Sequence, residues 1–230
     1  VVKAVRAAVK EAGALEVEFG VYDWRAGKDY QFTWPFDRLY PDYLQSSQVS
    51  TYTPLFPYHI ALIGDEVRED REGLPKADVL PWITPGDAGT FSGDSFRYAL
   101  LECFANGARG MNFWSGRLWD AELLAAYARV VRDVAPVEDL IINGELLEGA
   151  EVAEPARVSG IVNGDEMMVL VADYFRPGPT EVSVELPVRK PSVVVDLDTA
   201  EEVGKIAPGE ALTVPLPGER ARLLHVKPEG

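Results

Sequence analysis

Carboxylates stand at the ends of two strand-like segments of this sequence. Asp23 follows an alternating segment at residues 15–22, and Asp87 is the first carboxylate after a strand-like segment at residues 79–84. A pair of carboxyl groups can supply the acid and base that cleave a glycosidic bond. We therefore predict that Asp23 and Asp87 are catalytic residues.

Other ionisable residues fit structural roles better. Asp65 and Glu66 belong to a charge run typical of a solvated helix face, and Asp94 suits the positive end of a helix dipole. His59 opens a helical segment directly after a strand end, where it can bind a substrate hydroxyl or pack within the loop. His225 lies in a strand-rich region and is predicted to be structural.

Aromatic residues gather at the same strand ends. The five tryptophans all fall at predicted strand ends or in the segments that follow them: Trp24, Trp34, Trp82, Trp114 and Trp119. Rigid apolar rings with a polar edge suit the C–H faces of sugars, and polar groups between them orient hydroxyls. The alternative for each ring is packing in the core or in an interface. The predicted substrate-binding residues are Trp24, Tyr52, His59, Trp82, Asn112 and Trp114.

The first 146 residues alternate between strand-like and helical patterns. Strands are predicted at residues 15–22, 48–54, 79–84 and 110–114. Helices are predicted to end at Gly13, to span residues 58–72, to run from Ser92 to Gly107, and to span residues 120–134. Strands that alternate with helices form parallel βα units. A whole (β/α)8 barrel takes about 250 residues, so these four βα units fit half of a TIM barrel.

The pattern changes at about residue 147. Seven strand-like runs separated by short turns follow, at residues 156–162, 166–174, 180–186, 192–197, 202–206, 211–216 and 221–226. Val182 and Val184 alternate with polar residues, as expected for a sheet with one buried face. We predict half of a (β/α)8 barrel at residues 1–146 and an antiparallel β-sandwich domain at residues 147–230.

Residues 98–115 (YALLECFANGARGMNFWS) carry a family resemblance. This run resembles the last helix and last strand of TIM-barrel glycoside hydrolases such as the barrel β-galactosidases, where an A-N-G-A-x-G passage leads into the eighth strand. Residues 196–201 (DLDTAE) resemble the D-x-x-T-G-E hairpin of the β-sandwich that follows the barrel in many of these enzymes. The resemblance implies the C-terminal half of such a barrel, a C-terminal β-sandwich, and hydrolysis of O-glycosyl bonds.

The same resemblance implies two catalytic carboxylates, a nucleophile at the end of the seventh strand and an acid/base at the end of the fourth. The matching seventh-strand end of this chain, residues 82–86 (WITPG), contains no Glu. The fourth strand would lie before residue 1. A missing N-terminal half is therefore expected to carry at least one catalytic carboxylate.

Composition disfavours several classes of function. The chain has 22 Lys and Arg against 37 Asp and Glu, a net charge of −15, which disfavours nucleic acid and anionic membranes as partners. No apolar run approaches the ~20 residues of a transmembrane helix. The sequence has no P-loop, G-x-G-x-x-G, zinc-ligand spacing or H-E-x-x-H motif, so neither a cofactor nor a metal is predicted. The single cysteine, Cys103, is predicted to be a buried structural thiol.

The 47% hydrophobic composition predicts a soluble folded protein, and the cellular compartment stays open. The sequence begins Val1-Val2-Lys3 without a signal-peptide pattern, and it is expected to be a fragment of a longer protein. Four parallel strands alone leave two open sheet edges. Either an N-terminal barrel half or a second copy of the chain is expected to close the barrel.

Two functions fit these patterns. The first is a glycoside hydrolase that acts on an oligosaccharide or polysaccharide by carboxylate acid/base catalysis. The alternative is a catalytically inactive carbohydrate-binding or scaffold protein, which the missing Glu at residues 82–86 favours. Oligosaccharides should bind to both, but only the enzyme would release reducing sugar.

Overall fold

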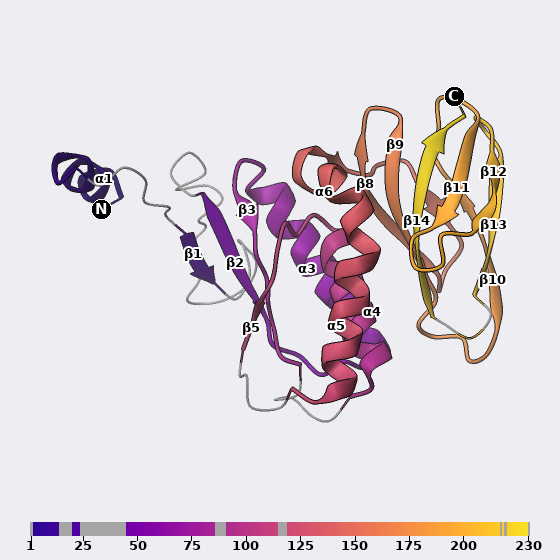
Figure 1. Ribbon diagram of the computed structural model, residues 1–230, viewed down its shortest axis with the longest axis horizontal. Helices are drawn as coiled ribbons and strands as arrows, with labels where there is room; N and C mark the ends of the chain where they lie inside the picture. Colours follow the sequence, from indigo (N-terminus) through magenta and orange to yellow (C-terminus); the bar gives the residue numbers. More distant parts are fainter. Residues whose placement is uncertain are drawn as a thin grey trace.

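The computed structural model describes residues 2–13, 20–23, 45–85, 91–114, 119–216, 218 and 220–229. Figure 1 shows a parallel sheet followed by a layer of helices and then by antiparallel strands. Helix α1 (Val2–Glu11) lies at the opposite end of the molecule from the antiparallel strands, beyond β1.

The parallel sheet provides four strand positions. Its strands are β1 (Gly20–Asp23), β2 (Ser46–Thr51), β3 (Asp78–Val79), β4 (Trp82–Ile83) and β5 (Asn112–Phe113), in the order β1-β2-β4-β5. Strands β3 and β4 occupy one position, because both pair with β2 in the same register. Pro81, which has no N–H to donate, lies between them. All these pairs are parallel, which confirms the predicted half-barrel.

Three helices follow strands of this sheet and cover its outer face: α3 (Pro57–Gly73), α4 (Gly93–Ala105) and α5 (Ala121–Val134). Two of their N-termini are capped by side chains. Ser92 Oγ accepts a hydrogen bond from the Ser95 N–H at 3.2 Å, and Asp120 Oδ1 accepts one from the Leu123 N–H at 2.8 Å. The helix start predicted at Ser92 is therefore confirmed, with Ser92 as the N-cap.

The chain leaves α5 through a short turn rather than directly into a strand. The 3-10 helix η1 (Ala135–Val137) contains Pro136, and α6 (Glu138–Asn143) follows it. Helix α5 ends at Val134, as predicted, because Pro136 cannot donate the backbone hydrogen bond that would continue the helix. The sequence did not predict α6.

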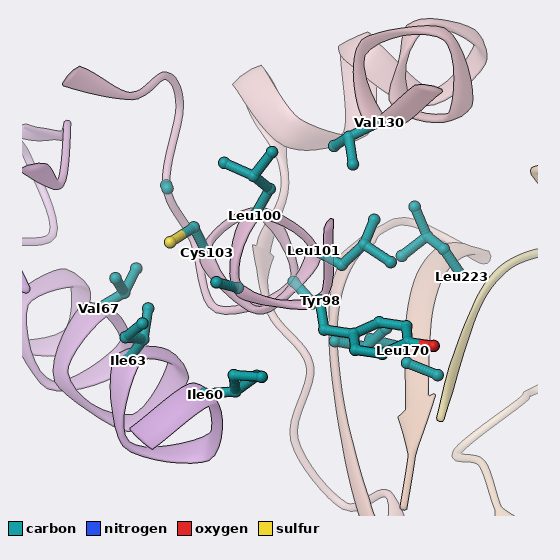
Figure 2. Packing of buried hydrophobic residues seen from close by; sticks show 14 of the residues in the cluster. Ile60, Ile63, Val67, Tyr98, Leu100, Leu101, Cys103, Val130, Leu170 and Leu223 are labelled. Carbon is teal, nitrogen blue, oxygen red and sulfur yellow. The ribbon is translucent and has the colours of Figure 1, made fainter. Parts of the chain in front are cut away.

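Aliphatic side chains fill the space between the helices and the neighbouring sheets. Figure 2 shows residues of α3, α4 and α5 meeting residues of the antiparallel strands: Ile60, Ile63, Val67, Tyr98, Leu100, Leu101, Cys103, Val130, Leu170 and Leu223. Cys103 is fully buried, which confirms the predicted structural thiol, and burial raises the pKa of that thiol. A β-carbon at Gly64 would lie 2.2 Å from Glu102 Oε2, so only glycine permits this approach of α3 to α4.

The antiparallel strands form two sheets. The larger has the order β12-β11-β14-β9-β8-β6, from β6 (Glu145–Leu146), β8 (Arg157–Asn163), β9 (Glu166–Ala172), β11 (Ser192–Asp196), β12 (Glu202–Ile206) and β14 (Ala221–Pro228). The smaller has the order β13-β10-β7, from β7 (Glu151–Val152), β10 (Thr180–Glu185) and β13 (Ala211–Leu216). All seven predicted strands are confirmed. The two-residue strands β6 and β7 are too short to show a pattern and were not predicted.

Strand β9 is buried on both faces. Met168 and Leu170 belong to the core shared with the helices, whereas Val169 and Val171 belong to the core between the two antiparallel sheets. Successive side chains along a strand point to opposite faces of its sheet. The larger sheet is therefore the middle layer, packed between the helices and the smaller sheet.

An ionic cluster around the buried Glu102 joins α4 to the larger sheet, and we call it the junction cluster: Asp65, Glu102, Asn106, Arg157 and Tyr174. Glu102 Oε1 accepts hydrogen bonds from Tyr174 Oη at 2.8 Å and Arg157 Nε at 3.1 Å. Glu102 Oε2 accepts from Asn106 Nδ2 at 3.0 Å, and Arg157 Nη2 also reaches Asp65 Oδ1 at 2.7 Å. Burial raises the pKa of Glu102, while Arg157 opposes that rise.

A second ionic contact joins α5 to the turn between β11 and β12. Asp198 accepts hydrogen bonds from Arg129 Nε at 2.9 Å and Arg132 Nη2 at 2.7 Å. The hydrogen bond from Arg129 lowers the pKa of Asp198. Ala200 in the same turn has a φ of 59°, a left-handed conformation that favours glycine. The D-x-x-T-G-E hairpin that this turn resembles has glycine at this position.

Candidate functional site

The face of the half-barrel sheet that points away from the helices is polar and aromatic. In the parallel register Tyr22 pairs with Gln48, Ser50 with Trp82, and Trp82 with Asn112. The alternate residues Val49 and Ile83 lie in the helix-side core. The paired side chains therefore share the inner face of the half-barrel.

Four rings close into a circle where these strands end. Trp82 meets Tyr22 at a centroid distance of 6.0 Å and Trp114 at 6.4 Å, and Trp114 meets Tyr52 at 5.6 Å. The phenol oxygens of Tyr22 and Tyr52 complete the circle with a 2.8 Å hydrogen bond. We call these rings, together with Gln48, the strand-end cluster.

Backbone ladders set the positions of the two indoles. Trp82 is held by strand pairing and by Thr51, whose Oγ1 donates to the Trp82 carbonyl at 2.9 Å. The Trp114 N–H donates to the Ile83 carbonyl at 2.9 Å, one residue beyond β5. Both rings thus stand on the rigid sheet, which suits a preformed binding surface.

Gln48 has a fixed orientation and a spare donor. The indole Nε1 of Trp82 donates to Gln48 Oε1 at 3.0 Å, and because an indole N–H can only donate, the amide oxygen must face it. Within the described ranges no hydrogen bond engages the amide nitrogen of Gln48. That NH2 group can donate to a ligand hydroxyl.

The rings of the strand-end cluster differ in their exposure. Burial and the hydrogen bond with Tyr22 raise the pKa of Tyr52. Tyr22 is 51% exposed and Trp114 is 52% exposed, while Gln48, Tyr52 and Trp82 are half-buried. The cluster is therefore open to a ligand.

The structure brings three predicted binding residues together, namely Tyr52, Trp82 and Trp114. Asn112 lies beside them, but its Nδ2 donates to the Leu80 carbonyl at 3.2 Å. His59 stands apart at the start of α3, in ring contact with neighbouring aromatic residues. The substrate-binding role of all five residues remains a prediction.

Several predicted residues fall where the structure gives no side chain. The backbone of Asp23 ends β1, but its side chain lies outside the described part of the chain. Trp24, Trp34 and Asp87 lie outside it entirely, with backbone and side chain. Trp119 is described and packs against Phe96, Phe113 and Tyr127 on the helix side. Trp119 therefore packs in the core, which was the alternative to sugar binding for each tryptophan.

The weaker candidates have structural contacts. Asp65 pairs with Arg157 in the junction cluster, and Asp94 is an exposed residue in the first turn of α4. His225 lies 3.2 Å from Glu166 in the larger sheet, as expected for a structural residue.

Sequence reasoning missed Tyr22 and Gln48. Their signal was the two-residue alternation of β1 and β2, but the pairing of Tyr22 with Gln48 depends on strand register. Among the residues that the structure describes, no group of three His, Cys, Asp or Glu side chains is arranged to hold a metal ion. No described helix is long and apolar enough to cross a bilayer.

Comparison with known proteins gives matches in structure only. No protein-family model matches the sequence, and no curated protein matches it. A GH27 β-L-arabinopyranosidase from Geobacillus stearothermophilus, solved with arabinose, is similar over 100% of this chain and 54% of its own, at 15% identity and a TM-score of 0.67. The chain thus spans about half the length of that enzyme.

Two α-galactosidases show the same likeness. Alpha-galactosidase I from Mortierella vinacea matches 99% of this chain and 62% of its own, at 11% identity and a TM-score of 0.63. The α-galactosidase of Saccharomyces cerevisiae matches 99% of this chain and 67% of its own, at 9% identity and a TM-score of 0.62. The resemblance predicted from sequence is confirmed for the fold: this chain is built like half of a glycoside hydrolase (β/α)8 barrel followed by a β-rich domain.

Proposed function

We propose that the strand-end cluster binds a sugar ring as part of the active site of a glycoside hydrolase. The observation that carries this proposal is the closed circle of Tyr22, Trp82, Trp114 and Tyr52, with the Gln48 amide beside Trp82. Active sites of (β/α)8 barrels lie at the carboxyl ends of the strands, where this cluster stands. Rings with interspersed donors match the alternating C–H and hydroxyl surfaces of a sugar.

The substrate class that we propose is a pyranoside of galactose or arabinose. The support is the fold shared with a β-L-arabinopyranosidase and two α-galactosidases. At 9–15% identity that likeness establishes the fold alone, so the sugar is tested by binding both pyranosides to this chain.

For the chemistry we propose Asp23 and Asp87 as the carboxylates of this chain. Asp23 is the last residue of β1, and Asp87 follows β4 in sequence. Hydrolysis needs one carboxyl to protonate the leaving oxygen and another to attack or activate water. Asp23→Asn or Asp87→Asn should lower hydrolysis of nitrophenyl galactoside or arabinopyranoside by the complete barrel at least a hundredfold without unfolding it. Wild-type rates in both variants would refute this assignment.

We propose that four further βα units, from an N-terminal barrel half, close the sheet. In the described part of the chain, the edges formed by β1 and β5 pair with no strand on their outer side. A second copy fits less well, because a barrel carries one helix for each strand. If β5 of one copy paired with β1 of a second copy, α5 of the first copy and α1 of the second would both have to lie over the groove between these two strands.

Native mass spectrometry followed by denatured mass on the same sample tests this arrangement. The expected result is a second polypeptide, or a longer chain, that supplies the remaining units. A homodimer of 25.3 kDa chains with full activity would contradict it.

A catalytically inactive sugar-binding protein is the second candidate. The observation that favours it is the end of β4, where Trp82-Ile83-Thr84-Pro85 offers no carboxylate. A complete barrel that binds sugar but releases no reducing sugar from α-galactosides or β-L-arabinopyranosides would support this candidate.

A further inference from the structure

A second group of rings lies at the start of α3 and just before α4, and we call it the rim patch: Phe56, Tyr58, His59 and Phe91. Phe56 packs edge-on against Phe91 at 5.3 Å, and Tyr58 packs edge-on against His59 at 5.5 Å. Phe91 is anchored in the helix-side core. Phe56 and Tyr58 nevertheless remain 57% and 65% exposed, so folding alone does not account for them.

The chain itself limits the distance between the two groups. Tyr52 of the strand-end cluster and Phe56 of the rim patch are four residues apart, so their α-carbons are separated by at most about 14 Å. Phe56 directly precedes α3, which follows β2, and Phe91 lies just before α4, which follows β4. Both helices begin at the end of the half-barrel where the strands finish (Figure 1). The two groups therefore share one edge of the molecule.

The exposed rings of this edge differ from the apolar residues exposed elsewhere. Among the described residues, the exposed aromatic side chains are Tyr22, Phe56, Tyr58, Trp114, Tyr127 and Phe175. The first four belong to the strand-end cluster and the rim patch. The exposed large aliphatic side chains are Val5 on α1, Leu124 and Val131 on α5, and Ile142 on α6. Rings without aliphatic neighbours favour a ligand that stacks, as sugar faces do.

An imidazole belongs to the rim patch. His59 contacts both Phe56 and Tyr58, and among the described residues its buried Nδ1 has no hydrogen-bond partner. The rim patch thus combines aromatic rings with a polar side chain, as the strand-end cluster does with Gln48.

We infer that the rim patch binds further sugar units of a glycan chain whose terminal unit occupies the strand-end cluster. This inference rests on the proposed function and narrows its substrate class to oligosaccharides or polysaccharides. A chain of several sugar units can cover the distance set by residues 52–56. The rim patch contributes affinity for long substrates without contacting the bond that is cleaved.

Calorimetric titration with two probes tests the inference. The probes are methyl α-D-galactopyranoside, which has one sugar unit, and α-1,6-linked galactotriose, which has three. We expect the full chain to bind the trisaccharide at least tenfold more tightly. The double variant Phe56→Ala/Tyr58→Ala should lose this preference through a roughly tenfold rise in the Kd of the trisaccharide, with the Kd of the one-unit probe unchanged.

Two further variants separate this inference from the proposed function. Phe175→Ala removes an exposed ring outside the rim patch and should change neither Kd, whereas Trp82→Ala should abolish binding of both probes. A double variant that keeps the full trisaccharide preference overturns the rim patch as a subsite and leaves the strand-end cluster intact. A wild-type chain that binds neither probe overturns the galactoside function and the subsite together. Loss of self-association in the double variant, with sugar binding unchanged, would identify a contact between copies instead.

Discussion

The strand-end cluster and the junction cluster both combine aromatic and polar side chains, but they differ in how completely their polar atoms are paired. Glu102 of the junction cluster is fully buried, and both of its oxygens accept hydrogen bonds from neighbouring side chains. In the strand-end cluster two rings are half exposed, and no residue that the structure describes engages the amide nitrogen of Gln48. A closed cluster stabilises the fold, whereas an open one retains hydrogen-bonding capacity for a ligand.

The same difference determines whether a substitution changes the free energy of unfolding or the free energy of sugar binding. Removing a partner from a buried, fully paired cluster leaves an uncompensated charge, which is costly for folding. Removing a donor from an exposed cluster costs folding little, because water replaces it. Substitutions in the junction cluster should therefore lower stability more than sugar binding, whereas substitutions in the strand-end cluster should lower sugar binding more than stability.

The largest expected effect is that of Glu102→Ala. It leaves Arg157 and Tyr174 without their main acceptor, and the free energy of unfolding should fall by about 3 kcal/mol in urea titration. Sugar affinity of the folded fraction should not change. Asp94→Ala, which removes an exposed carboxylate from the same helix, should cost less than about 1 kcal/mol. Equal losses in the two variants would show that the junction cluster stabilises the fold no more than an exposed carboxylate does.

The second effect is that of Gln48→Ala on ligand binding. It removes the spare amide donor and the support of the Trp82 indole, so the Kd for methyl α-D-galactopyranoside should rise about tenfold, equivalent to about 1.4 kcal/mol. The free energy of unfolding should fall by less than about 1 kcal/mol. Asn143→Ala removes an exposed amide from α6 as a matched control and should leave the Kd unchanged. A large stability loss with unchanged affinity would place Gln48 with the structural residues.

The third effect concerns pH and the contact between α5 and the β11–β12 turn. Arg129 holds the pKa of Asp198 below its usual value of about 3.9. A carboxylate with a lowered folded pKa adds stability above its unfolded pKa, and that stability is lost as the pH falls through the folded pKa. Asp198→Asn should cost about 1 kcal/mol at pH 7 and flatten the decline in stability between pH 5 and pH 2. If urea titrations of Asp198→Asn showed the same decline in the free energy of unfolding at low pH as the wild type, the pair of Arg129 and Asp198 would contribute nothing to stability.

The smallest effect is a gain at Ala200. Its φ of 59° lies in the left-handed region, which costs a residue with a β-carbon roughly 1 kcal/mol relative to glycine. Ala200→Gly should therefore raise the free energy of unfolding by about 0.5–1 kcal/mol and strengthen the turn that carries Asp198. A decrease in thermal unfolding temperature would contradict the strain assigned to this residue.

The sequence predicted the elements that carry long periodic patterns. The helix at residues 58–72 is α3, and the alternation of Val182 and Val184 with polar residues marks β10, because burial of one face imposes these periods on the sequence. Strands β6 and β7 escaped prediction because two residues carry no period.

The candidate site was predictable only in part. Trp82 and Trp114 were found from their place at strand ends, but their contact with Tyr22 depends on the register between strands. The junction cluster left no sequence signal, because Arg157, the partner of Glu102, is 55 residues away in the sequence. Long-range pairing of this kind is set by tertiary packing rather than by local pattern.

Tryptophan fluorescence titration with galactose and with arabinose tests most directly whether the strand-end cluster is a sugar site. Trp82→Phe should remove most of the fluorescence change caused by the sugar, because Trp82 lies at the centre of the cluster. Trp119→Phe should leave it intact, because Trp119 packs on the helix side. A sugar-dependent change that survives Trp82→Phe and disappears in Trp119→Phe, or no change with either sugar, would contradict a binding role for this cluster.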